Sequence, residues 1–108
     1  MINPKYPVYI VSKGRAKTGG TRKSLDRMGV PYKIAVEPQD HDDYAAEVGE
    51  SKLLVLPFSN HGDGPGRARN WCWEHSISQG DKRHWVLDDN IDDFYRLHKK
   101  LQSTKYNN

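Results

Sequence analysis

The sequence predicts an α/β fold, a Rossmann-like three-layer sandwich around a mostly parallel sheet, built as a single domain over residues 1–108. Two observations support this prediction. Short apolar segments alternate along the chain with segments of helical periodicity, in the order β-α-β-α-β-α-β-α. Helical connections between short buried strands place successive strands parallel, with helices covering the sheet. A length of 108 residues and a hydrophobic content of 35% suit one globular domain with a modest core.

The first strand is expected over residues 6–11, and a basic loop with three glycines follows over residues 12–20. A short helix is predicted next, because Thr21 is a suitable N-cap and Gly29 a suitable C-terminal stop. The two buried positions of this helix are expected at Leu25 and Met28.

The second strand is expected over residues 32–36 and the second helix over residues 40–48. The third strand is expected over residues 53–57, and its uninterrupted apolar character predicts burial on both of its faces.

The rest of the chain is predicted to hold a glycine-rich turn over residues 58–66, a helix ending at Gly80, a strand over 84–87, a helix over 91–101 and a polar tail over 102–108. In the first of these helices the buried stripe follows the spacing i, i+3, i+4, i+7, at Ala68, Trp71, Cys72 and His75.

Composition narrows the classes of protein. Cys72 is the only cysteine, so an intrachain disulfide framework and a thiolate zinc site are excluded. The longest apolar runs are too short to span a bilayer, and residues 1–5 do not resemble a signal peptide. We therefore expect a cytoplasmic protein with no membrane partner.

Charge is distributed unevenly along the chain. Residues 1–33 carry eight Lys or Arg and one acid, whereas residues 34–63 carry seven acids and one base. A basic N-terminal third can attract the phosphates of a nucleotide or of a nucleic acid. Solvated helix faces explain such charges equally well, so charge alone does not select a function.

The most informative motif is Asp88-Asp89-Asn90, which directly follows the predicted strand 84–87. Open α/β sheets bind ligands beyond the carboxyl ends of their strands, and clustered oxygen ligands suit Mg²⁺ or Mn²⁺ shared with substrate phosphates. The alternative interpretation is a solvated turn that caps the next helix.

Strand position excludes several other phosphate-handling or metal-dependent enzymes. Haloacid dehalogenase-type phosphatases and Toprim-like nucleases need an acid after the first strand, where this chain has Ser12-Lys13-Gly14-Arg15. The chain also lacks the G-x-x-x-x-G-K-[ST] phosphate loop, and no G-x-G-x-x-G follows the first strand. What remains is a late acidic motif combined with an early basic loop.

The helix before the acidic strand opens with Gly66-Arg67-Ala68-Arg69-Asn70. Arginines in a first turn oppose the helix dipole, a small cost that is tolerated if they pair with carboxylates or phosphates. Two interpretations stay open for Arg69: a structural salt bridge to the acidic motif, or direct contact with a ligand.

Taken together, the loop ending in Arg15, the segment Gly66-x-Ala68-Arg69-Asn70 and the segment Leu87-Asp88-Asp89-Asn90 resemble a GT-A glycosyltransferase. The closest resemblance is to the TET-associated glycosyltransferases of tailed phages, over about residues 6–100. It implies the donor-nucleotide-binding half of a GT-A fold, a UDP-linked sugar donor, and Mn²⁺ or Mg²⁺ bridging the donor diphosphate.

The resemblance also implies roles for individual residues. The donor-binding set is Ser12, Lys13, Gly14, Arg15, Glu37, Arg67, Arg69, Asn70 and Asp88, and the metal-binding set is Asp88, Asp89 and Asn90. The implied acceptor is a hydroxyl on modified DNA, such as that of a hydroxymethylated base. If the protein is phage-encoded, the implied location is the host cytoplasm. No catalytic base is identified.

The alternative function is a non-catalytic nucleic-acid-binding or interaction module of the same fold. Basic residues 13–33 with Tyr32 and the tryptophans would then contact a nucleic-acid backbone and its bases. Trp71 on a core stripe and Trp85 in a strand argue against it, because both positions favour packing.

Overall fold

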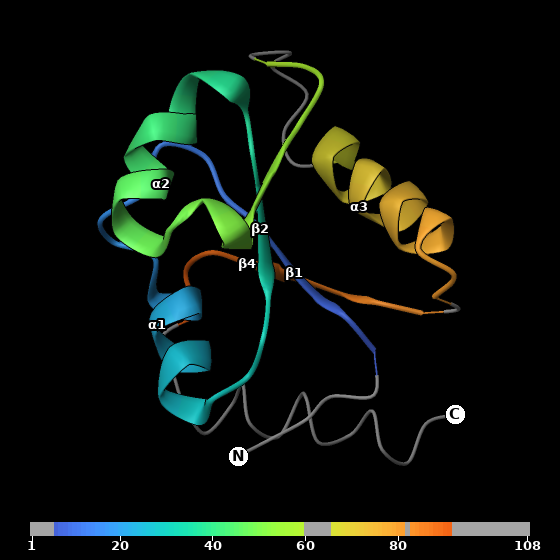
Figure 1. Ribbon diagram of the computed structural model, residues 1–108, viewed down its shortest axis with the longest axis horizontal. Helices are drawn as coiled ribbons and strands as arrows, with labels where there is room; N and C mark the ends of the chain where they lie inside the picture. Colours follow the sequence, from blue (N-terminus) through green and yellow to red (C-terminus); the bar gives the residue numbers. More distant parts are fainter. Residues whose placement is uncertain (1–5, 60–65, 82, 92–108) are drawn as a thin grey trace.

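The computed structural model describes residues 6–59, 66–81 and 83–91. Its strands form one parallel sheet in the order β3-β2-β1-β4, with α1 and α2 on one face and α3 on the other (Figure 1). The strands are β1 Val8–Val11, β2 Lys33–Val36, β3 Leu53–Val55 and β4 Trp85–Asp88. The predicted three-layer α/β architecture is confirmed.

The helices also lie where the sequence predicts them. They are α1 Gly20–Met28, α2 His41–Val48 and α3 Gly66–Ser78, and the 3₁₀ turns η1 Pro38–Asp40 and η2 Glu50–Lys52 flank α2. Gly29 ends α1 in the left-handed conformation, with φ of +71°, and the backbone amide returns to carbonyls of the last turn. The predicted helix 91–101 and tail 102–108 lie outside the described residues, apart from Ile91.

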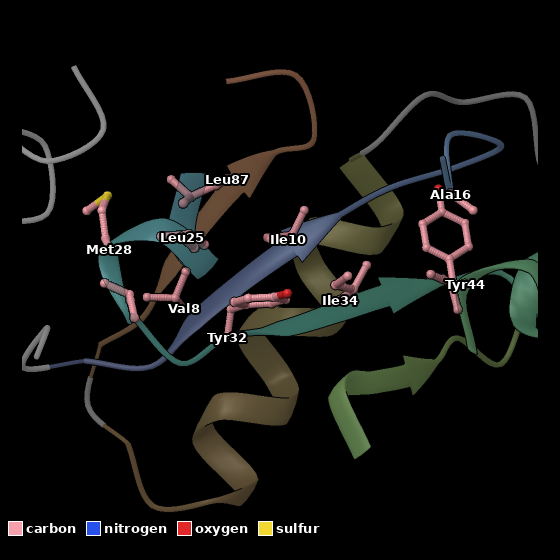
Figure 2. Close-up of a cluster of buried hydrophobic side chains, with 11 residues drawn as sticks. Val8, Ile10, Ala16, Leu25, Met28, Tyr32, Ile34, Tyr44 and Leu87 are labelled. Atoms are coloured by element: carbon pink, nitrogen blue, oxygen red, sulfur yellow. The ribbon is translucent and has the colours of Figure 1, made fainter. Parts of the chain in front are cut away.

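Successive side chains of each strand point to opposite faces of the sheet, so the core consists of two clusters, one on each face. In β1, Val8 and Ile10 face α1 and α2, whereas Tyr9 and Val11 face α3. The cluster on the α1/α2 face, drawn in Figure 2, comprises Val8, Ile10, Ala16, Leu25, Met28, Val30, Tyr32, Ile34, Val36, Tyr44 and Leu87. The cluster on the α3 face comprises Tyr9, Ala35, Leu56, Ala68 and Cys72.

The prediction that β3 is buried on both faces is wrong. β3 lies at an edge of the sheet, Leu53 and Leu54 are partly buried, and Val55 is 45% exposed. An apolar run indicates that a segment is at least partly buried, but it does not indicate where the strand lies in the sheet. Leu56, just after the strand, is 2% exposed and belongs to the α3-face cluster.

The prediction that Thr21 caps α1 is also wrong. The helix begins one residue earlier, its N-cap is Gly19, and no side-chain hydrogen bond caps it. Thr21 is instead fully buried against the end of β4. Its hydroxyl donates to the Asp88 carbonyl and accepts a hydrogen bond from the Ile91 amide at 2.8 Å.

The strand order creates a switch point beside β1. The chain adds β2 and β3 on one side of β1 and then returns to add β4 on the other side, with Val11 in register with Asp88. Ligands of open α/β sheets bind in the crevice at such a point, beyond the carboxyl ends of the strands. The loop after β1 and the acidic motif after β4 meet there. Within the ranges that the structure describes, no helix has the length and apolar character needed to cross a membrane.

Candidate active site

The loop after β1 is tied directly to the acidic motif. Ser12 Oγ donates to Asp89 Oδ2 at 2.7 Å, and Arg15 Nη1 donates to Asp89 Oδ1 at 3.0 Å. Both carboxylate oxygens of Asp89 are therefore engaged, and its side chain is only 11% exposed. Asp89 acts as an anchor for the loop.

Asp88 has a different environment from its neighbour. Its side chain is 59% exposed and pairs with Arg69 of α3. Asp88 is the last residue of β4 and pairs with Arg69 of α3 on one face of the sheet, whereas Asp89 follows the strand and binds Ser12 and Arg15. The structural salt bridge between Arg69 and the acidic motif is thus present, whereas contact of Arg69 with a ligand stays a prediction.

The remaining predicted loop residues also contact acids. Lys13 Nζ lies 3.6 Å from Glu37 Oε1 at the end of β2, and the Lys13 side chain is about half exposed. The Gly14 amide donates to Asp40 Oδ2 at 2.9 Å, and its φ of +67° is a left-handed conformation that glycine adopts without strain. The structure therefore brings Lys13, Gly14 and Glu37 to the same edge.

Two predicted donor-binding residues of α3 have contacts elsewhere. The Arg67 guanidinium lies 5.6 Å from the centre of the Phe58 ring, and Asn70 Nδ2 donates to Glu74 Oε1 at 3.3 Å along the helix. Of the three predicted residues of α3, Arg69 contacts the acidic motif. Arg67 contacts Phe58, and Asn70 contacts Glu74.

Sequence reasoning missed the role of Tyr44. This α2 side chain is 2% exposed, its hydroxyl lies 2.5 Å from Ser12 Oγ, and it accepts a hydrogen bond from the Arg15 amide at 2.9 Å. Burial raises the pKa of the Tyr44 hydroxyl, so the hydroxyl stays protonated at neutral pH. The sequence shows Tyr44 only as a core position of a helix, which hides the polar end of the side chain.

A small cavity lies behind these contacts, with Ser12, Arg22, Tyr44 and Asp89 in its lining. Its volume of about 10 Å³ is roughly the space of one water molecule. A nucleotide does not fit inside it. The groups that a larger ligand can reach are the exposed ones, Lys13, Arg15, Asp88 and Asn90, which we call the rim.

The rim offers two oxygen-bearing side chains, Asp88 and Asn90, to a divalent cation. Across residues 6–59, 66–81 and 83–91, no three His, Cys, Asp or Glu side chains gather as a metal site. Mg²⁺, however, is usually held by one or two carboxylates together with substrate phosphates and water. The exposed Asp88 carboxylate and Asn90 carboxamide fit that pattern, whereas the oxygens of Asp89 already have partners.

Comparison with known proteins identifies the family. The sequence model of the TET-associated glycosyltransferases matches residues 6–108, nearly the whole chain. The chain belongs to this family. It is therefore a glycosyltransferase, as the resemblance implied. No curated protein matches the chain, and no solved structure matches it.

In this TET-associated glycosyltransferase, the switch point between β1 and β4 brings together a basic loop and a carboxylate pair. One aspartate of the pair is structural and the other is accessible.

Proposed function

We propose that this glycosyltransferase binds a nucleotide-sugar donor, a UDP-sugar, over the carboxyl ends of β1 and β4 and transfers the sugar to an acceptor hydroxyl. The observation that carries the proposal is the parallel register of Val11 with Asp88, which sets the loop 12–15 beside an exposed carboxylate. Cationic groups and an accessible acid at one edge suit a diphosphate with a divalent cation.

Three cationic side chains lie at the rim or beside it. Lys13, Arg15 and Arg69 are each about half exposed, and each pairs with a carboxylate. The Arg69–Asp88 pair is exposed on both sides, and because such pairs contribute only about 0–1 kcal/mol, a diphosphate with its cation can replace it at little cost. A guanidinium can then hold phosphate oxygens in bidentate geometry.

Mn²⁺ or Mg²⁺ is the proposed cofactor, with Asp88 and Asn90 as the residues that would hold it. When bound, such a cation offsets the negative charge that builds on the departing diphosphate. Binding of a cation at Asp88 would also free Arg69 for the donor, because the two groups are paired without ligand. Asp89 keeps its contacts with Ser12 and Arg15 and orients the loop.

The proposed acceptor is a hydroxyl on modified DNA, such as a hydroxymethylated base. The TET-associated description of the family supports this choice. The excess of Lys and Arg in residues 1–33 supports the approach of a polyanion.

Thermal melts with UDP and Mn²⁺, with UDP alone, and with a DNA oligomer test this function. We expect metal-dependent stabilisation by UDP, amounting to about 2.7 kcal/mol at a free concentration of 100 Kd. A salt-sensitive shift with DNA and none with UDP would instead support the non-catalytic nucleic-acid-binding alternative. Trp71 and Trp85 pack against the two core clusters, which already counts against their use as stacking platforms.

The acidic motif yields a sharper prediction. In Asp88→Asn we expect the melting temperature without ligand to stay nearly unchanged and the UDP–Mn²⁺ shift to be lost, because the exposed carboxylate serves the cation. In Asp89→Asn we expect a loss of about 1–3 kcal/mol of stability without ligand, because a buried charged partner of Ser12 and Arg15 is changed.

Asp81→Asn is the matched control, because Asp81 precedes β4 and thus lies at the opposite end of that strand. It should retain both the stability and the UDP–Mn²⁺ shift. A full UDP–Mn²⁺ shift in Asp88→Asn would refute the assignment of Asp88 to the cation.

A further inference from the structure

The hydrogen bonds around Tyr44 have a definite direction. Asp89 Oδ2 can only accept from Ser12, so the single Ser12 proton is committed to that bond. The contact between Ser12 Oγ and Tyr44 Oη must then use the Tyr44 proton. Tyr44 Oη in turn accepts from the Arg15 amide.

These bonds close into a ring that begins and ends at one residue. The Arg15 amide donates to Tyr44, Tyr44 to Ser12 and Ser12 to Asp89, and the Arg15 guanidinium donates back to Asp89. We call this the hydrogen-bonded ring. It fixes the backbone and the side chain of Arg15 at the same time.

The ring joins a buried frame to an exposed group. Ser12, Tyr44 and Asp89 are 6%, 2% and 9% exposed, whereas the Arg15 side chain is 56% exposed. Low local dielectric strengthens buried hydrogen bonds and makes an unpaired member costly. The frame is therefore rigid, and the part of the ring that a ligand can reach is the guanidinium.

We propose that Tyr44 is a positioning residue that acts through Arg15, holding the loop 12–15 in the shape that presents the guanidinium to the diphosphate of the donor. This inference rests on the proposed function. The guanidinium has N–H donors besides the one that Nη1 gives to Asp89, and these can bind phosphate oxygens while the Arg15 amide stays bound to Tyr44 and Asp89 keeps its contacts with Ser12 and Arg15. The loop thus keeps its shape when the donor binds.

Tyr32 provides a matched comparison within the same cluster. It is 5% exposed, and its hydroxyl donates to Asp26 Oδ1 at 2.9 Å. Tyr32 lies at the start of β2, whereas Tyr44 lies beyond its end (Figure 2). Tyr32→Phe removes the hydrogen bond to Asp26, whereas Tyr44→Phe removes the two bonds to Ser12 and Arg15, and only Tyr44 takes part in the hydrogen-bonded ring.

The first test needs no ligand. Amide hydrogen exchange measured by NMR should show the Arg15 amide exchanging at least about tenfold faster in Tyr44→Phe, because the amide loses its acceptor. In Tyr32→Phe its exchange should match the wild type. Unchanged exchange at Arg15 in a folded Tyr44→Phe protein would overturn the proposal.

The second test separates positioning from a merely structural role. With Mn²⁺ present, the affinity for UDP should fall about three- to tenfold in Tyr44→Phe and stay unchanged in Tyr32→Phe. In an Arg15→Gln background, Tyr44→Phe should cause no further loss, because Tyr44 acts through Arg15. Additive losses, or an equal loss in Tyr32→Phe, would overturn the proposal.

The two tests also distinguish this inference from the function on which it rests. A wild-type protein that binds no UDP with Mn²⁺ refutes the donor assignment and, with it, the role of Tyr44 toward the donor. Wild-type binding with unchanged affinity in Tyr44→Phe refutes the role of Tyr44 alone.

Discussion

The two faces of the sheet are built differently. Among the described residues, eleven buried side chains form the cluster under α1 and α2, and five form the cluster under α3. Tyr44 belongs to the larger cluster, and its hydroxyl takes part in the hydrogen-bonded ring near the carboxyl ends of the strands. The comparison shows that the site is supported mainly from the α1/α2 face.

The α3 face depends more on polar and aromatic contacts. Tyr9 Oη lies 2.8 Å from His75 Nδ1, Trp71 stacks on His75 with ring centres 5.2 Å apart, and His84 meets the Tyr9 ring edge-on at 5.7 Å. Burial raises the pKa of Tyr9 to about 12, so its hydroxyl remains protonated. Because such contacts weaken with small changes of geometry, and because fewer buried side chains support this face, we expect α3 to detach from the sheet at a lower free energy than α1.

The largest expected effect compares one leucine from each face. Leu25 of α1 is 0% exposed and Leu56 is 2% exposed, in the larger and smaller cluster respectively. Leu25→Ala should lower the free energy of unfolding by about 2–5 kcal/mol, and Leu56→Ala by less, because the smaller cluster can collapse around the lost volume. Urea unfolding measures both losses, and equal losses would contradict the expectation that the two faces differ in their contribution to stability.

Cys72 offers an intermediate effect that reports on α3 alone. Its thiol is 0% exposed, and burial raises its pKa from 9.0 to about 11, so a thiol reagent can react only when the α3 face opens. We expect the opening free energy from labelling at pH 8 to be lower than the global value, and nearly the same in Leu25→Ala as in the wild type. Opening that tracks global stability in both proteins would show that the faces unfold as one unit.

The smallest expected effect is pH-dependent. Burial lowers the pKa of His84 below 6.5, so its contribution to stability is present above about pH 6.5 and is lost as the pH falls toward the lowered value. In His84→Gln, the melting temperature should therefore fall less between pH 7.5 and pH 5.5 than in the wild type. Identical pH profiles would contradict this expectation.

His41 is the control of opposite sign. Hydrogen bonds to Glu50 and Asp42 raise its pKa, so its contribution is complete below about pH 6.5 and disappears as the pH rises through the raised value. The destabilisation caused by His41→Gln should accordingly be greatest at acidic pH and vanish at alkaline pH.

Much of the site could be predicted from residue order. Ser12 to Arg15 directly follow a strand, and Asp88 to Asn90 close another, and both segments reach the carboxyl edge. The different environments of Asp88 and Asp89 were not predictable, because they depend on which distant residues lie next to each side chain in the fold. Tyr44 was missed for the same reason, since its partners lie about thirty residues away in the chain.

The sequence by itself determined the alternation of strands and helices, the α/β class, the basic loop and the acidic motif, because each follows from local periodicity and composition. Only the tertiary structure decided that β3 is an edge strand, that Thr21 binds the end of β4 instead of capping α1, and that Asp89 is buried while Asp88 is exposed. The physical reason is that strand order is set by packing between distant segments. That order placed β4 beside β1 and so closed the hydrogen-bonded ring.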